Sequence, residues 1–418
     1  MTAVPAGSTR TGPLRAGPGG GAPGDPDVGR GSTVRLVLLA LVTYAASRVV
    51  SGLLVARAAR QQVPISWTGD PVDYWGMTLM WDGTWYRRIA ETGYPAALPV
   101  DPAGQVQQNE WAFYPLYPML CRAVMTVTGL EFRYAGALVA TLLGFLAAVL
   151  LVLLLRRHCS DGAALLALAV WSTYLATPVL QIAYTESLAM VLLVAFLLLL
   201  ERERWWGAVA VALLIGLSRP IGVPLGLVAL VAVWLRWRRR EERPVGRGEW
   251  AAMLATLVGC GVAGLVWPAV VWAATGSRTG YTDTMASWRA GHEIHLFRPW
   301  WDNAQYFFDG WALPVLVAYT AGLLLLALGP WARPLGWVLR TWLLAYPLYL
   351  FAVQDAQTSL YRYLVLMFPV ALVGVGAVRR VRTSTVVRAA ALVGVGIALQ
   401  VWWTQTILVL HLPASWPP

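Results

Sequence analysis

The sequence predicts an all-α polytopic membrane protein. Of its 418 residues, 58% are hydrophobic and 13% are charged, whereas soluble globular proteins carry roughly 25% charged residues. Apolar runs of about 20 residues, long enough to cross a bilayer as a helix, recur along the chain. The net charge of +11, all of its cations arginine, gathers in short segments between these runs. That pattern is typical of membrane topology and not of nucleic-acid binding.

The N-terminal segment 1–33 is rich in Gly, Pro, Ser and Thr. Such a composition buries too little apolar surface to fold, so we predict a disordered tail. Its arginines place this tail in the cytoplasm. The remaining segment, 34–418, is predicted to be one integral-membrane domain of the cell membrane.

About eleven transmembrane helices are predicted in this domain. They cover approximately 36–55, 134–155, 163–180, 187–201, 205–218, 221–235, 251–273, 312–330, 341–354, 364–378 and 389–409. The segment 113–130 carries Arg122 in its middle and two prolines at its start, which favours an interfacial or re-entrant helix over a full crossing. With this count, the arginine-rich segments all fall on the side of the N-terminus, as topology rules require.

The opposite face then carries two large extracytoplasmic loops, 56–112 and 274–311, and the first is predicted to contain short interfacial helices. Within the first loop, Asp82 lies among Trp81, Trp85 and Tyr86. One interpretation is a helix cap, with Asp82 as the N-cap and Trp81 and Tyr86 as a hydrophobic staple. The other is a carboxylate at the bilayer boundary that serves as a general base. The two roles compete, because a tightly bonded cap is a weaker base.

Three further charged residues lie at the outer ends of short apolar helices. Arg219 and Arg362 each present a planar fork of donors that matches a lipid phosphate, or they snorkel to the interface. Glu186 either orients an arginine such as Arg48 or Arg219, binds a sugar hydroxyl, or marks a hydrated turn. Arg48 lies inside the first predicted span, so it marks a functional site or pairs within the bundle.

The loop 274–311 holds carboxylates and histidines among several tryptophans. Its His292-Glu293-Ile294-His295 run has the histidines three residues apart and does not match the metal-binding HExxH pattern. Aromatic rings beside carboxylates suit sugar binding, and they equally suit an interfacial belt. The three cysteines are far apart in the sequence, which argues against a disulfide or zinc site.

Several motifs together resemble one family. The stretch Trp81-Asp82-x-x-Trp85-Tyr86-x-x-Ile89-Ala90-x-x-Gly93-Tyr94 resembles the first-loop signature of the PIG-V-like mannosyltransferases, which are related to GPI mannosyltransferase 2. The run from Phe113 to Pro118, which includes Tyr117, is similar to the family's aromatic-proline motif. Tyr184-Thr185-Glu186-Ser187, Ser218-Arg219-Pro220 and Arg362-Tyr363 look like its later motifs, in the same order.

This resemblance implies a GT-C-type fold and a glycosyltransferase of that superfamily. The donor would be a polyprenyl-phosphate sugar, mannose in particular, with inversion at the anomeric carbon. Asp82 would be the catalytic base, and Arg219 and Arg362 would bind the donor phosphate. Trp81, Trp85, Tyr86, Tyr117, Glu186 and Arg48 would bind or orient substrate.

The acceptor would be an extracytoplasmic lipoglycan, glycolipid or protein. The lack of lysine and the abundance of Ala, Gly, Val and Leu indicate a high-GC bacterial genome, so the GPI acceptor of the eukaryotic relatives is not carried over. The chemistry requires no added cofactor. A divalent metal is an open alternative that no pattern in the sequence supports, and no nucleic-acid partner is expected. An alternative from another class is a transporter or flippase of lipid-linked sugar or polyprenyl phosphate. It shares the arginines but predicts two related halves, and no internal repeat is visible in the sequence.

Overall fold

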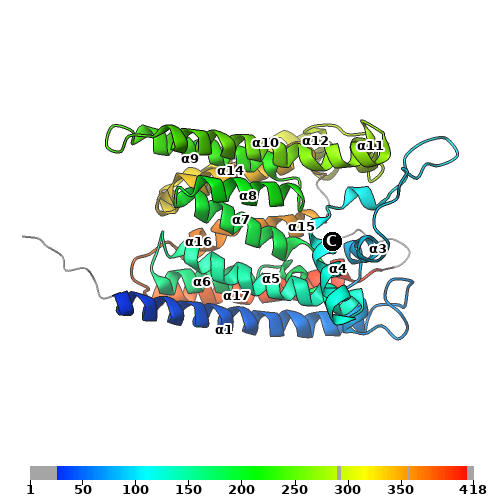
Figure 1. Ribbon diagram of the computed structural model, residues 1–418. Coiled ribbons are helices and arrows are strands. Elements are labelled where there is room, and N and C mark those ends of the chain that lie inside the picture. The colour runs from blue at the N-terminus through cyan, green and yellow to red at the C-terminus, as the bar shows by residue number, and fades with distance from the viewer. Residues whose placement is uncertain (1–25, 290–292, 356–357, 412–418) are drawn as a thin grey trace, which may run out of the picture.

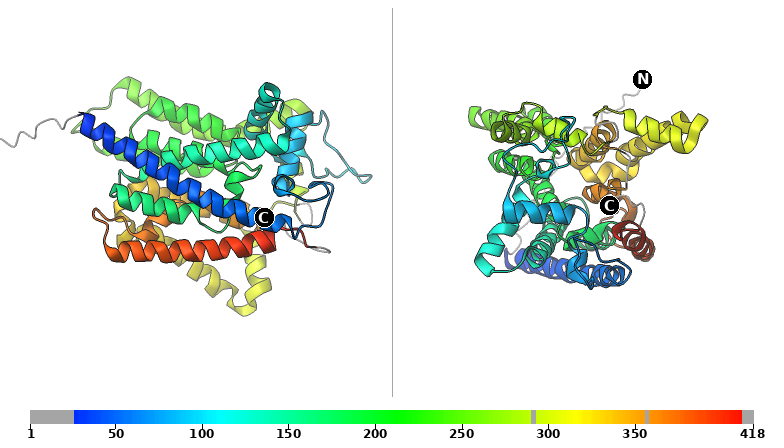
Figure 2. Two further views of the ribbon diagram at one scale, coloured as in Figure 1. Left: turned by 90° about the horizontal axis from the view of Figure 1, so that it is seen from below. Right: turned by 90° about the vertical axis from the view of Figure 1, so that its right-hand side faces the viewer.

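The protein is an α-helical membrane protein. The computed structural model describes residues 26–289, 293–355 and 358–411, and these contain helices and no strand, apart from one isolated bridge between Val100 and Val106. The helices form a bundle in which most axes run in nearly the same direction (Figures 1 and 2). The three cysteines are free and buried. The all-α class is therefore confirmed.

Six helical segments of the described chain are long and apolar enough to cross a membrane. They are Ser32–Ala59, Phe132–Leu155, Arg247–Thr275, Arg298–Leu328, Pro330–Val353 and Thr383–Leu408. They coincide with α1 (Pro26–Ala59), α5 (Phe132–Leu155), α10 (Arg247–Thr275), α12 (Arg298–Phe308) joined to α13 (Ala312–Leu328), α14 (Gly336–Val353) and α17 (Thr383–Trp403).

The other predicted spans coincide with shorter helices, so a count of about eleven stays a prediction. These are α6 (Asp161–Ser172), α7 (Glu186–Glu201), α8 (Trp205–Gly216), α9 (Gly222–Arg238) and α16 (Pro369–Val375). A 12-residue helix such as α8 spans only about 18 Å, less than the ~30 Å hydrocarbon core. Even so, they lie alongside the longer helices (Figure 1), and α7 is buried along nearly its whole length.

The first helix begins earlier than expected. Because α1 starts at Pro26, the last residues of the segment 1–33 belong to this helix and not to a disordered tail. Residues 1–25 of the predicted tail lie outside the described residues.

Short helices from the two predicted outer loops gather at the end of the bundle that lies away from the start of α1 (Figure 1). The first loop contains α2 (Tyr74–Met77), α3 (Asp82–Thr92) and η1 (Glu110–Ala112), and the second contains α11 (Gly280–Ala286) and part of the α12–α13 run. The segment predicted to be interfacial forms α4 (Leu116–Thr128), which packs against α3 and α5 and is not one of the six span candidates.

Arginines predicted to share one side meet at the opposite end, near the start of α1. Arg156 Nη1 donates to Thr33 Oγ1 over 2.9 Å, and Arg157 Nε donates to Glu201 over 2.7 Å. Arg239 pairs with Glu203 at 2.7 Å in the same region. Which side of a bilayer this end faces stays a prediction.

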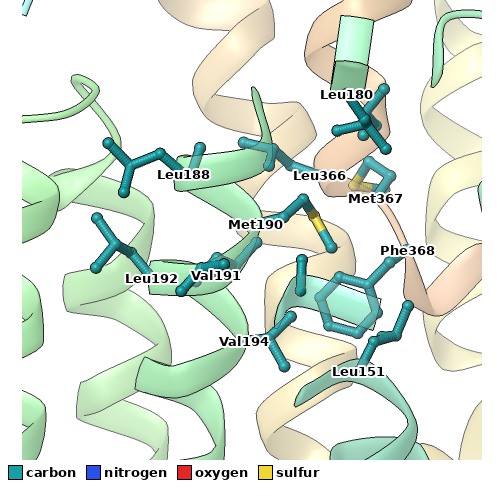
Figure 3. Close-up of a cluster of buried hydrophobic side chains, with 14 of the residues drawn as sticks. Leu151, Leu180, Leu188, Met190, Val191, Leu192, Val194, Leu366, Met367 and Phe368 are labelled. Atoms are coloured by element: carbon teal, nitrogen blue, oxygen red, sulfur yellow. The ribbon is translucent and has the colours of Figure 1, made fainter. Parts of the chain in front are cut away.

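A cluster of buried hydrophobic side chains fixes the middle of the bundle. Figure 3 shows Leu151 from α5 and Met190 and Val194 from α7 facing Leu366 and Phe368 of the chain between α15 (Leu360–Tyr363) and α16. All five side chains are buried. Close contacts of this kind hold helices together inside a membrane, where lipid supplies no hydrophobic driving force. They therefore hold the start of α7 and the end of α15, which carry charged residues, in fixed positions.

Candidate functional site

Four charged residues that are far apart in the sequence meet at the end of the bundle that carries α3. Arg362 Nη2 lies 2.6 Å from Asp82 Oδ2, and Arg362 Nη1 donates to Glu186 Oε1 over 3.0 Å. Arg219 Nη2 donates to the same Glu186 oxygen over 2.6 Å. The four come from α3, the start of α7, the α8–α9 connection and α15. We call Asp82, Glu186, Arg219 and Arg362 the charge cluster.

Asp82 is not the N-cap that one interpretation expected. The helix α3 begins at Asp82 itself, and the N-cap position is Trp81, which makes no side-chain capping bond. Trp81 has a φ of 58°, in the left-handed region that a bulky residue rarely adopts. Its indole Nε1 donates to the carbonyl of Leu408 over 2.9 Å, which holds it there. This backbone conformation places the Asp82 carboxylate toward Arg362, so the cap and staple prediction is wrong.

A glycine brings the first turn of α3 close to its support. A Cβ atom on Gly83 would lie 2.7 Å from the carbonyl oxygen of Thr78. That carbonyl accepts the backbone N–H of Ala183, just before α7. Only glycine allows this approach, and it brings Asp82 to the start of α7, where Glu186 lies.

Glu186 is the centre of the charge cluster and is fully buried. It begins α7, where the helix dipole favours negative charge. The Arg362 guanidinium lies over the rings of Tyr184 and Tyr363, and that of Arg219 over Tyr363, at 4.8–5.3 Å from the ring centroids. Buried ions are tolerable when they are paired in this way. The two arginines and two carboxylates balance, so the cluster is neutral when both acids are ionised.

Asp82 is the more exposed of the two carboxylates in the charge cluster. Its side chain is 15% exposed, against 0% for Glu186. Burial raises the pKa of Asp82, Arg362 opposes this rise, Glu186 adds to it, and the net direction is upward. For Arg362, burial works against the charge, but Asp82, Tyr363 and Glu186 outweigh it and raise the pKa. Asp82 therefore stays basic while Arg362 stays cationic.

The predicted aromatic residues divide into two groups. Trp85 stacks on Phe113, with ring centroids 5.6 Å apart, and its edge contacts Trp288 of the second loop at 5.3 Å. It lies three residues after Asp82, on the same face of α3. Trp85 therefore lies beside Asp82 on this face of α3.

Tyr86 and Tyr117 lie deeper. The Tyr86 hydroxyl lies 3.4 Å from Thr185 Oγ1, and the ring packs on Tyr117 with centroids 5.3 Å apart. The Tyr117 hydroxyl donates to the carbonyl of Gly136 over 2.9 Å. Both side chains are buried, and these contacts hold α3 and α4 against the interior of the bundle.

Arg48 does not join the charge cluster. Its guanidinium donates to the carbonyls of Ser172, at 2.6 Å, and of Thr177, and it lies over the Tyr44 ring. Ser172 is the last residue of α6, where carbonyls lack helical partners, and Thr177 is the first residue of the short helix η2 (Thr177–Gln181). Arg48 thus pairs within the bundle, and the arginines that contact Glu186 are Arg219 and Arg362.

One ion pair near this site, Arg289 with Asp355, was not predicted from the sequence. Arg289 Nε lies 3.6 Å from Asp355 Oδ2, and neighbouring Trp288 contacts Trp85. An arginine in a predicted outer loop departs from the positive-inside pattern, and that departure was the available signal. In the same loop, His295 pairs with Glu293 at 2.8 Å with both side chains largely exposed, while His292 lies outside the described residues.

Comparison of this chain with protein-family models and with curated proteins finds no match. The family resemblance therefore rests on the sequence motifs, four of whose charged residues converge in the charge cluster.

Proposed function

We propose that this protein is a PIG-V-like membrane glycosyltransferase of the GT-C superfamily. It transfers a sugar, mannose in particular, from a polyprenyl-phosphate donor to an extracytoplasmic acceptor, with inversion. The observation that carries the proposal is a partly exposed carboxylate, Asp82, held at 2.6 Å by a buried arginine, Arg362. The other members of the cluster are a second carboxylate and a second arginine.

The reaction needs one base. Asp82 accepts the proton of the acceptor hydroxyl, and the oxygen attacks the anomeric carbon from the face opposite the phosphate. The bond from that carbon to the phosphate oxygen breaks, and the phosphate leaves with the electron pair. Because a lipid phosphate is a good leaving group, the acid of a hydrolase carboxylate pair is not required.

The charge cluster supplies electrostatic compensation for this step. The donor phosphodiester carries one negative charge, and the departing phosphate gains a second. When Asp82 takes up the proton, it stops neutralising Arg362, and the cluster passes from neutral to a net charge of +1. Positive charge then develops next to Asp82 while negative charge develops on the phosphate, which stabilises the transition state more than the ground state. Arg362 is the arginine best placed for this role, because it contacts Asp82 directly.

The direct test is transfer by the purified protein. We expect label from radioactive polyprenyl-phosphate mannose to reach a membrane glycolipid extract, and Asp82→Asn to lower the rate by about 100- to 10,000-fold. Glu241→Gln, at the other end of the bundle where the Glu241 side chain is 87% exposed, is the carboxylate control and should keep the wild-type rate. Wild-type protein that moves labelled lipid across proteoliposomes without transferring sugar would favour the transporter instead.

A further inference from the structure

A cavity lies on the opposite face of α3 from Asp82. Its volume is about 570 Å³, and it is bounded by the chain before α2, by α3, by the end of α4 and by the α4–α5 connection. Arg87 and Glu91 of α3 line it. At 100° per residue, these two side chains project from the face of α3 opposite Asp82 and Trp85. The cavity is therefore separate from the charge cluster.

The cavity contains a cation without a partner. Within the described part of the chain, the Arg87 side chain forms no hydrogen bond or ion pair, and its buried Nε is unsatisfied. Leaving a buried guanidinium N–H unpaired costs free energy of about 1–3 kcal/mol. Arg87 is thus positioned to donate to a ligand that enters the cavity.

The lining favours a neutral polar ligand. Arg133 pairs with Glu131 at 2.8 Å, and both line the cavity together with Arg87 and Glu91. The lining carries two guanidinium groups and two carboxylates, so their formal charges balance and no net positive charge draws an anion. Donors and acceptors beside an aromatic ring, here Trp67, suit the hydroxyl groups and C–H faces of a sugar.

One residue of the cavity lining contacts the residue that precedes Asp82. The Trp67 ring contacts that of Trp81, with centroids 5.9 Å apart, and Trp81 directly precedes Asp82. We propose that this cavity binds a carbohydrate. The carbohydrate is part of the acceptor: the reacting hydroxyl lies at Asp82, and the rest of the acceptor passes the N-terminal end of α3 and enters the cavity. The assignment of the sugar to the acceptor rests on the proposed function, whereas carbohydrate binding itself does not.

The test is calorimetric titration of the full-length protein in a detergent without a sugar headgroup. The probes are neutral trisaccharides (mannotriose, maltotriose and cellotriose), with glycerol phosphate as the anionic probe. We expect at least one trisaccharide to bind with a millimolar or lower Kd, and Trp67→Ala and Arg87→Met each to weaken it about tenfold. Trp206→Ala and Arg60→Met alter exposed residues that do not line the cavity, and they should bind as wild type does.

Two results would overturn the proposal. The first is that no trisaccharide binds the wild-type protein, whether or not glycerol phosphate binds. The second is that trisaccharide binding is unchanged in both cavity variants. Circular dichroism of each variant checks folding, and two independent cavity substitutions guard against a folding defect in one. Sugar binding without transfer by wild type would refute the proposed function alone. Transfer without sugar binding would refute this inference alone.

Discussion

The two ends of the helix bundle use the same residue types in opposite ways. At the end near the start of α1, Arg236 lies 2.6 Å from Glu249 and 3.5 Å from Glu203, and Arg243 lies 2.6 Å from Glu203. At the other end, Arg362 and Arg219 share Glu186, and Arg362 also holds Asp82. Both are networks of arginines and carboxylates linked through a shared acid.

Exposure separates the two networks. In the first network Arg236 is buried, but the side chains of Arg239 and Arg243 are 56% and 61% exposed. In the charge cluster both arginines are buried, with Arg362 and Arg219 only 5% and 10% exposed. Solvent and salt screen the first network, so one charge more or less changes little there. In the charge cluster the charges balance in a poorly solvated setting, so one proton changes the local field strongly. A balanced, buried network can respond to proton transfer in a way that a solvated network cannot.

The largest expected difference between the two ends is in stability. Glu186→Gln removes the acid shared by two buried arginines, and we expect it to lower the free energy of unfolding by about 3–5 kcal/mol. Glu203→Gln should cost no more than about 1 kcal/mol, because its two nearest partners, Arg239 and Arg243, are exposed, and the buried Arg236 keeps its pair with Glu249. Thermal unfolding in detergent measures both. Equal losses at the two ends would refute the distinction.

A smaller effect concerns the pH dependence of transfer. Arg362 lowers the pKa of Asp82 against the upward effect of burial. In Arg362→Gln that opposition is gone, so the pKa of Asp82 should rise further. The base works only when deprotonated, so the acid limb of the rate profile should move to higher pH, by about 1–3 units. An acid limb that stays at the wild-type pH in this variant would mean that Arg362 does not act on the base.

The smallest effect is expected from an exposed pair. Arg239→Ala should change the free energy of unfolding by at most about 1 kcal/mol, and the change should shrink further at 1 M salt. Repeating the unfolding measurement at low and high salt checks this. A large, salt-independent loss of unfolding free energy would show that solvent and salt screen this network as little as they screen the charge cluster.

Much of the site could be named from the sequence, but its connections could not. Glu186, Arg219 and Arg362 stood out because charge is costly at the edge of an apolar run. Asp82 stood out as a carboxylate among aromatic residues of the first outer loop. Their pairing depends on four elements separated by long stretches of chain, and local patterns carry no information about such contacts. For the same reason, Arg48 was grouped with them although it bonds backbone carbonyls elsewhere.

Local rules also failed where the backbone departs from common conformations. The pattern after Trp81 is that of a capped helix, and helix caps normally have extended backbone before the first turn. Trp81 instead adopts a positive φ, held by its bond to Leu408 near the other end of the chain. A contact so distant in sequence decides the orientation of Asp82. Residues with such conformations cost about 1–3 kcal/mol and cluster at functional sites.

The positions of the helices were easier to predict than the number of helices that cross the membrane. Each predicted span from 36–55 to 389–409 contains a helix, because long apolar runs specify helices. Helices such as α6 and α8 are shorter than the bilayer core, and sequence gives their apolar character without saying whether they face lipid or protein.

The pH profile of transfer by the wild-type protein and by Asp82→Asn tests the central claim most directly. The wild-type rate should fall with falling pH through an apparent pKa above the usual range of an aspartate, because burial raises the pKa of Asp82. It should recover on return to neutral pH. The residual rate of Asp82→Asn should lack this limb. A wild-type rate that is flat to pH 4, or the same acid limb in Asp82→Asn, would contradict the assignment of Asp82 as the base.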